Sequence, residues 1–375
     1  MKKIVGILSA AAVLATSVFA LDISAMIQLD GNLATIADGT FNAIELNEWD
    51  PQGSSDFVWK FDVSGDQAGA TVFSYAPGDH GVVSNDQNVQ EWNLWFKPIE
   101  QIKVTVGYIG YDYGVKPHFG WWAAVINRED YGFAADFDFG ALKLSAGIGA
   151  AYTGLWGTRA YNTYWFDKDY VGLRKLGAFW FGGAYTIDGV GTIGGSINRG
   201  AKVNPHGFAQ TQCWGGTPMA FDLYFANQPW GQTGYFADLA LVMKEKNPYG
   251  GSEEDFSLEL DRLTGQLYFE FHADAFTLYV VDVLELNFAE NADMDTNPKI
   301  FKDGFEIKAQ YALDAITPYV QIDGYGVMDD SLGVKLGLGF NVGTCAIDCG
   351  ANFALGWADD FACTVTFPIE FTVNF

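Results

Sequence analysis

Charged side chains occupy every second position in several stretches of this 375-residue sequence, with large apolar side chains between them. A phenylalanine separates Lys60 from Asp62, and another separates Asp136 from Asp138. In an extended strand, residues two apart project from the same face. Each stretch therefore predicts a row of charges on one face of a strand. Rows of carboxylates attract cations, and a lysine opposite an acid creates a local field, so the chemistry predicted is selection of ions and solutes.

Residues suited to bond-making chemistry are sparse. Of the four histidines, His80, His118 and His206 fall in separate predicted loops, and His272 falls at a strand end without a matching serine. The cysteines form no CxxC pair or Cys/His cluster, which favours small packing roles over a zinc site. The GxGxxG match at 189–194 lies on a strand–turn–strand, and the calcium-like segment 293–297 lacks the required glycine. We therefore predict no catalytic residue, no metal and no cofactor.

The first twenty residues have the three-part pattern of a secretory signal peptide. Lys2 and Lys3 precede an apolar segment at 4–15, and small or β-branched residues lead to Ala20. Cleavage between Ala20 and Leu21 would leave 21–375 as a single domain. The net charge of −25 excludes nucleic acid as a partner, because no basic patch is available for phosphates. No later apolar run reaches the roughly 18 residues of a transmembrane helix.

The rest of the chain consists of short alternating segments joined by turns that are alternately short and long. A soluble sandwich also alternates, but here the apolar faces are large and aromatic while the polar faces are rich in glycine and charge. This combination predicts an all-β fold, a transmembrane antiparallel up-and-down β-barrel of about 18 strands. The strands are predicted at 21–35, 56–63, 68–76, 91–97, 101–110, 130–139, 141–152, 177–187, 191–199, 218–226, 233–244, 264–272, 276–287, 303–313, 317–327, 332–342, 346–357 and 361–375.

Sixteen strands is an open alternative, because the segments 68–76 and 276–287 are weak. Asp282 and Glu285 fall on opposite phases, which predicts a bulge or a misplaced strand there. Tight turns are predicted at 64–67, 97–100, 140, 188–191, 273–275 and 314–316, and long connections at 37–55, 77–90, 111–128, 153–176, 200–217, 245–263 and 288–302.

The C-terminal segment alternates aromatic and aliphatic residues with polar ones from Phe361 and ends on Phe371, Val373 and Phe375. It resembles the terminal strand of bacterial outer-membrane proteins, which the barrel-assembly machinery reads. Pro368 departs from the pattern and requires a position where no ladder hydrogen bond is needed. The segment 95–107 also resembles hairpins of spirochaetal porin-like outer-membrane proteins. The resemblance implies a location in the bacterial outer membrane, in contact with its lipid.

The first strand begins close to the predicted cleavage site, which leaves no segment for a plug, so the barrel is expected to enclose water. Strands of clear phase carry twelve acids but only six lysines on their polar faces, which predicts a preference for cations. The candidate pore-lining residues are Lys60, Asp62, Lys103, Asp136, Asp138, Lys143, Asp222, Asp238, Glu306, Lys308, Asp348 and Glu370.

The connection 153–176 is rich in aromatic and charged residues. If it folds inward, its rings are suited to stacking on sugars, and it or 111–128 is the expected constriction. The alternative is an aromatic girdle at the membrane surface. The residues concerned are Trp156, Arg159, Tyr161, Tyr164, Trp165 and Arg174.

The function predicted is passive diffusion of small hydrophilic solutes and ions through an acidic lumen. The alternative is a surface adhesin or structural barrel whose long loops bind host matrix. Fold-level analogy with porins of this size admits a homotrimer.

Overall fold

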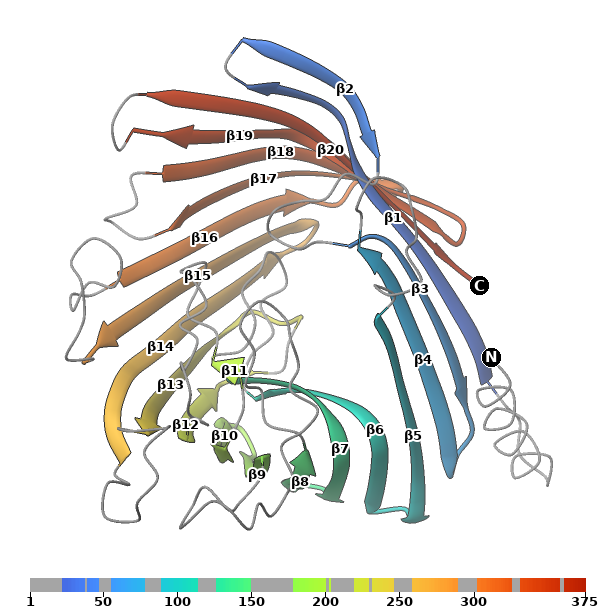
Figure 1. The fold of residues 1–375 in the computed structure, drawn as a ribbon, viewed down its shortest axis with the longest axis vertical. Coiled ribbons are helices and arrows are strands. Elements are labelled where there is room, and N and C mark those ends of the chain that lie inside the picture. Colours follow the sequence, from blue (N-terminus) through green and yellow to red (C-terminus); the bar gives the residue numbers. More distant parts are fainter. Residues whose placement is uncertain are drawn as a thin grey trace. The chain divides into compact units, whose positions relative to one another are not determined.

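The computed structural model in Figure 1 is built from β-strands. It describes residues 22–37, 39–46, 55–77, 89–113, 126–149, 178–199, 202–203, 219–228, 231–245, 258–288, 302–325, 331–357 and 361–375. No helix in this described part of the chain is long and apolar enough to cross a membrane. The chain divides into two compact units, one comprising Met1–Gly107, Gln310–Val320 and Gly333–Phe375, the other Tyr108–Ala309 and Gln321–Leu332.

Twenty strands are described, and every recorded pairing between them is antiparallel. Those that begin in the first unit are β1 (Asp22–Ala37), β2 (Thr40–Leu46), β3 (Ser55–Ser64), β4 (Ala68–Pro77), β5 (Val89–Ile99), β6 (Ile102–Tyr113), β17 (Ile316–Tyr325), β19 (Cys345–Gly356) and β20 (Ala362–Asn374). Those that begin in the second are β7 (Ile126–Phe139), β8 (Leu142–Gly149), β9 (Ala178–Ile187), β10 (Gly191–Arg199), β11 (Lys202–Val203), β12 (Met219–Ala226), β13 (Gly234–Glu245), β14 (Leu258–Ala273), β15 (Phe276–Asn287), β16 (Lys302–Tyr311) and β18 (Ser331–Val342).

The first and last strands pair with each other, as Figure 1 shows. β1 pairs with β20 over Met26–Ile36, and Ala25 and Phe375 exchange two backbone hydrogen bonds of 3.1 and 2.8 Å. On its other side the N-terminal half of β1 pairs with β3 and its C-terminal half with β2. Neither end of the chain therefore leaves an unpaired sheet edge, which is the condition for a sheet placed in lipid.

The eighteen predicted strands all correspond to described strands, with β2 and β11 as the additions, so the alternative of sixteen is wrong. β2 continues the β1 hairpin within the predicted connection 37–55. β11 lies within 200–217 and pairs with Ile126 and Asn127 at the start of β7. Three strands are at least four residues longer than predicted, since β5 covers Val89–Ile99, β7 begins at Ile126 and β14 begins at Leu258.

The prediction of a bulge in 276–287 is wrong for the pairing of β15 with β14. The register of β14 and β15 runs unbroken from Ala273↔Phe276 to Arg262↔Asn287. Near Pro368, which was predicted to need a position without a ladder hydrogen bond, the β1–β20 register shifts between Asn32 and Thr35, directly beside the Asn32↔Pro368 pair. A bulge leaves a local gap in the ladder, which accommodates a residue without an N–H.

Five of the six tight turns lie where they were predicted, and the one predicted at 97–100 is displaced to residues 100–101, because β5 continues to Ile99. Two of them lack glycine and place an aspartate in the left-handed region instead, with φ of 53° at Asp274 and 47° at Asp314. Aspartate tolerates this conformation better than most side chains. At the β7–β8 turn, the Gly140 N–H donates to Asp138 Oδ1 over 2.9 Å.

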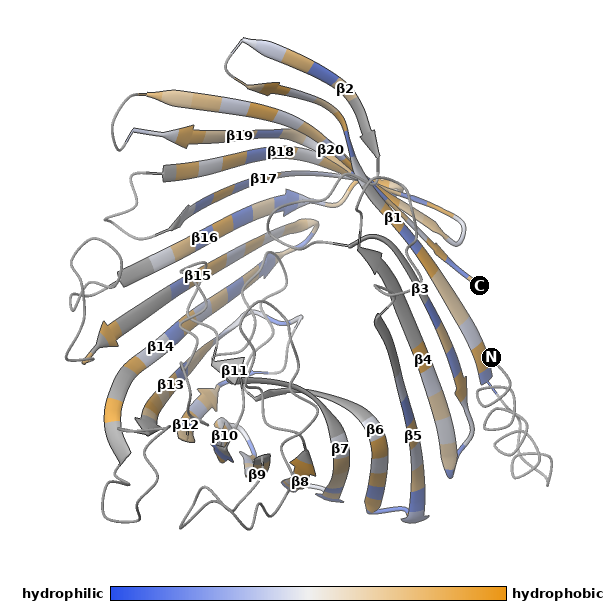
Figure 2. Ribbon diagram, viewed as in Figure 1, coloured by the Kyte–Doolittle hydropathy of each residue, from blue (hydrophilic) through white to orange (hydrophobic). Residues whose placement is uncertain are grey.

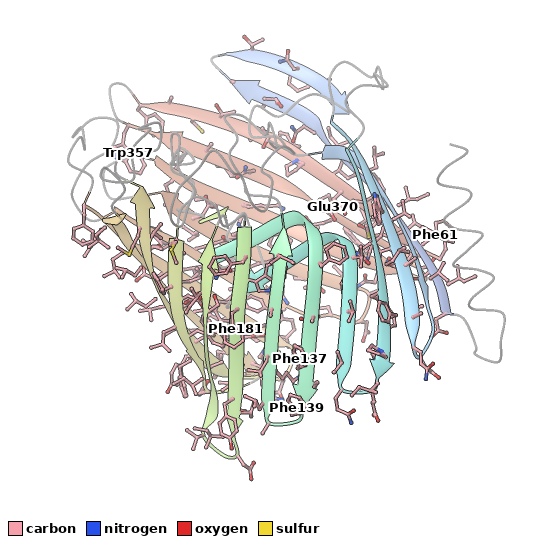
Figure 3. All side chains as sticks on the ribbon, turned by 60° about the horizontal axis from the view of Figure 1, so that its bottom comes forward. Phe61, Phe137, Phe139, Phe181, Trp357 and Glu370 are labelled. Atoms are coloured by element: carbon pink, nitrogen blue, oxygen red, sulfur yellow. The ribbon has the colours of Figure 1, made fainter. Side chains whose placement is uncertain are left out.

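Apolar and polar residues alternate along the strands, as the colours in Figure 2 show, and the exposure of the two faces is inverted relative to a soluble protein. On adjacent strands of the second unit, Leu223 and Leu239 are 61% and 51% exposed, whereas Asp222 and Asp238 are 7% and 4% exposed. Figure 3 shows Phe137, Phe139 and Phe181 among the side chains on the apolar face of β7 and β9. An apolar outer face and a polar covered face are typical of a sheet whose outer solvent is lipid.

Aromatic rings on the polar face lie over glycines of the neighbouring strand. Trp180 covers Gly147, with which it is paired in register, and its indole N–H donates to Ser145 Oγ over 3.2 Å. Tyr319 covers Gly337 in the same way. Any Cβ at these glycines would overlap the ring. The glycine-rich polar faces therefore have a packing cause.

We predict that Gly147→Ala lowers the free energy of unfolding by about 1–3 kcal/mol, because the Trp180 ring must leave its position. Urea unfolding in detergent, followed by tryptophan fluorescence, measures the change. Gly356→Ala is the matched control, since a Cβ there meets nothing within 4 Å. Equal stability of the two variants would contradict the packing role of Gly147.

Candidate functional site: the polar strand faces

Two buried carboxylates lie on the polar face of β12 and β13 in the second unit. Asp222 is opposite Ser196 on β10, whose hydroxyl donates to Asp222 Oδ1. Asp238 is opposite Tyr224 on one side and Gln266 on the other. Because Asp222 is paired with Ala240, the two acids are diagonal neighbours, within reach of each other across the strand pair.

Several polar atoms of this face are buried without a hydrogen-bond partner among the described residues. They include Asp222 Oδ2, both carboxylate oxygens of Asp238, both amide atoms of Gln266, and the hydroxyl of Thr264. Gln266 is only 1% exposed. Buried polar groups are normally satisfied by protein, water or a ligand. The face around Gln266 therefore has unused hydrogen-bonding capacity of both kinds, donor and acceptor.

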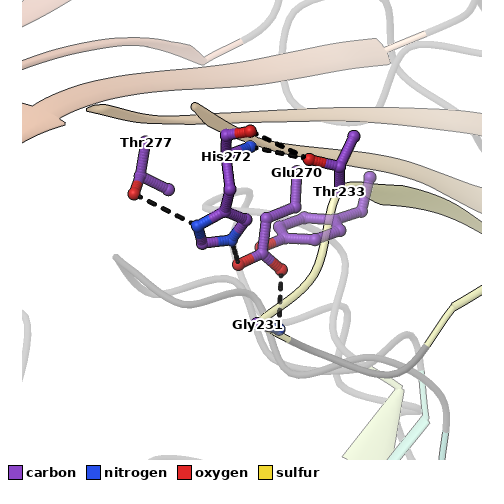
Figure 4. A network of polar contacts seen from close by, with 6 residues as sticks. Gly231, Thr233, Glu270, His272 and Thr277 are labelled. Carbon is purple, nitrogen blue, oxygen red and sulfur yellow. Dashed lines mark hydrogen bonds and ion pairs between the residues drawn. The ribbon is translucent and has the colours of Figure 1, made fainter. Parts of the chain in front are cut away.

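A second polar network lies at the end of β14 beside the β12–β13 connection (Figure 4). His272 Nε2 is 2.5 Å from Glu270 Oε1, and the Gly231 N–H donates to Glu270 Oε2 over 3.2 Å. The Tyr268 hydroxyl also donates to Oε2 over 3.2 Å. The His272 N–H donates to Thr233 Oγ1 over 2.8 Å. These bonds join β14 to the β12–β13 connection, which makes the network a structural clamp.

Three lysine–aspartate pairs lie elsewhere on the polar faces. In the first unit, Lys60 Nζ lies 2.8 Å from Asp62 Oδ2, and Lys335 Nζ lies 3.2 Å from Asp348 Oδ1. In the second unit, Lys143 Nζ lies 3.5 Å from Asp138 Oδ2. Such pairs cancel much of each other's field at a distance. Asp222 and Asp238 differ from these pairs, because Asp222 Oδ2 and both carboxylate oxygens of Asp238 accept no hydrogen bond from the described residues.

Lys335 and Asp348 belong to a tight cluster with Tyr319. The Tyr319 hydroxyl donates to Asp348 Oδ1 over 2.6 Å, and Lys335 Nζ lies 5.3 Å from the centre of the Tyr319 ring. Lys103 lies similarly over Trp95, at 5.3 Å. These contacts hold the long lysine side chains against the polar face of the sheet.

The remaining candidate pore-lining residues lie on polar faces of their strands. Asp136 accepts from the Ser145 hydroxyl over 2.9 Å. Glu306 is 1% exposed, and Lys308 follows it two residues along β16. Glu370 is exposed on β20 and accepts from the Thr372 hydroxyl over 3.2 Å. The uncharged Gln266 and Thr264 were missed by the sequence reasoning, although their alternation along β14 places them on the same face as Glu270.

Other candidate residues lie outside the described part of the chain. These are the loop residues Trp156, Arg159, Tyr161, Tyr164, Trp165 and Arg174, the predicted cleavage site Ala20–Leu21, and the histidines 80, 118 and 206. The predicted terminal signal is described. Phe371 and Val373 pair with Leu29 and Ile27 of β1.

The described residues include no group of three or more His, Cys, Asp or Glu side chains that could hold a metal ion. Cys345, Cys349 and Cys363 are free thiols.

No protein family model and no curated protein sequence matches this chain. Several solved structures do match this chain. OpdO of Pseudomonas aeruginosa is 10% identical, with 95% of this chain and 97% of that chain covered and a TM-score of 0.56. OccK2 (OpdF) of the same organism is 11% identical, with 94% and 97% covered and a TM-score of 0.53. The outer-membrane protein OpdK of Pseudomonas aeruginosa is 12% identical, with 94% and 99% covered and a TM-score of 0.53.

These likenesses show the fold. The chain is an antiparallel transmembrane β-barrel of eighteen spanning strands, the fold of bacterial outer-membrane porins, as predicted. The narrower resemblance to spirochaetal porin-like proteins stays a prediction.

We predict that Glu270→Ala lowers the free energy of unfolding by about 1–3 kcal/mol, because Gly231, Tyr268 and His272 lose their shared acceptor. Urea unfolding in detergent measures it. Glu100→Ala, at an exposed turn position between β5 and β6, is the matched control and should leave stability unchanged. A neutral Glu270 variant would argue against the clamp.

Proposed function

We propose that the protein is a passive porin of the bacterial outer membrane that admits small hydrophilic solutes and ions. The observation that carries this proposal is the inversion of the strand faces, apolar and exposed on one side, polar and charged on the other. Lipid is the solvent suited to the first face, and water and solutes are suited to the second. The twelve candidate pore-lining residues from Lys60 to Glu370 are the polar side chains assigned to that path.

We further propose that the pore prefers cations. The described lysines Lys60, Lys143 and Lys335 are matched by neighbouring acids, so they contribute little net field. Asp222 and Asp238 have no lysine partner among the described residues, and the strands of clear phase carry more acids than lysines on their polar faces. Crystals of the OpdK porin hold vanillate, an anionic carboxylate. The acidic wall of the present chain favours solutes of the opposite sign.

The route to the membrane belongs to the same proposal. Residues 1–20 act as a cleaved signal peptide and 21–375 as one barrel. The terminal strand with Phe371, Val373 and Phe375 addresses the chain to the barrel-assembly machinery, and a homotrimer is the oligomer suggested by porins of this size. No catalytic activity is proposed, since the fold is one of channels.

The test is conductance of the refolded mature chain in a planar bilayer under a potassium chloride gradient. We expect discrete steps with a cation-selective reversal potential. Asp222→Asn and Asp238→Asn together should move the reversal potential toward that of a non-selective pore, because the unpaired charges are removed. Anion-selective steps would overturn the sign. No steps from protein shown to be folded would overturn the porin and favour the adhesin alternative.

Processing at Ala20 is tested by the intact mass of protein exported by a bacterial host. We expect a mature chain that begins at Leu21. Ala20→Trp should block cleavage, because signal peptidase requires a small residue at this position. A wild-type mass that retains the first twenty residues would contradict the prediction.

A further inference from the structure

The side chains around Gln266 combine carboxylate oxygens that accept no hydrogen bond from the described residues with unused amide and hydroxyl groups. We call Asp222, Asp238, Thr264 and Gln266 the unpaired patch. All four are at least nine-tenths buried, with 7% of Asp222 exposed and less of the others. The patch crosses three adjacent strands, β12, β13 and β14, and its register is regular there.

The patch requires a particular chemistry from whatever occupies it. Its free carboxylate oxygens call for a positive charge, and Gln266 Oε1 calls for a donor. Gln266 Nε2, however, is an unused donor and calls for an acceptor. A bare metal ion offers no acceptor, and a neutral sugar offers no charge. An ammonium group with a neighbouring hydroxyl offers both.

The neighbourhood also suits an organic solute. Tyr224 is paired with Asp238 and stacks on Phe236, with ring centres 5.6 Å apart. Aromatic faces favour the C–H groups of a small solute and stabilise a cation held near them. Because the carboxylates are deeply buried, the charged group that reaches them must be small. A primary ammonium is close in size to a water molecule.

We propose that the unpaired patch is a subsite for small solutes that carry a primary ammonium group beside a hydroxyl, as amino sugars do. The proposal rests on the proposed function and adds a substrate class to it. Asp222 and Asp238 accept from the ammonium, and the Gln266 amide bonds the neighbouring hydroxyl.

The experiment compares glucosamine with glucose as blockers of potassium current through the pore, at about pH 6, where the amine is protonated. The two solutes differ by an ammonium in place of a hydroxyl. We expect glucosamine to reach half-block at a concentration about tenfold lower than glucose. Asp238→Asn should remove most of that difference, and Asp222→Asn should reduce it.

Asp188→Asn is the matched control, because it removes the same charge at an exposed turn between β9 and β10. It should leave the tenfold difference intact. Asparagine has nearly the same shape as aspartate, and circular dichroism verifies that each variant is folded.

Equal block by glucosamine and glucose, in a pore that conducts, would overturn the subsite and leave the porin proposal standing. Block by Ca²⁺ at lower concentrations than glucosamine, lost in Asp238→Asn, would also overturn it, because the patch would then be a metal site. Absence of any conducting step would overturn the porin and the subsite together.

Discussion

The backbone in lipid finds no water to hydrogen-bond, and this constraint governs the rest of the structure. A sheet meets it only when every edge is paired. Here the pairing of β1 with β20, sealed by the mutual hydrogen bonds of Ala25 and Phe375, joins the chain's first strand to its last. The bulge beside Pro368 is tolerated because it lies within this seam without ending it.

Because the backbone hydrogen bonds are made within the sheet, the two faces of the sheet differ only in their side chains, each suited to the solvent it meets. Apolar groups such as Leu223 and Leu239 are exposed on one face, and acids such as Asp222 and Asp238 are covered on the other. The covered face must then be packed without an apolar core. Aromatic rings laid over glycines, as Trp180 lies over Gly147, provide this packing and keep the polar side chains beside them in place.

The charges of the polar face divide into two kinds. Those that are paired, such as Lys60 with Asp62 and Lys335 with Asp348, hold the wall together and nearly cancel at a distance. Those of the unpaired patch have no such offset. The residues that stabilise this polar face are therefore different from those that leave polar atoms without a partner.

The sequence by itself determined the spanning strands and most of the tight turns, because alternation of period two and turn residues such as Asp274 and Asp314 are local signals. It predicted the eighteen spanning strands and placed Asp222 and Asp238 on polar faces. It did not determine which residues meet. That Gln266 lies opposite Asp238, that β1 is shared between β2 and β3, and that β11 pairs with β7 follow only from the tertiary structure. The physical reason is that every strand has the same alternation, so the pattern assigns a face but leaves the register between distant segments to the pairing itself.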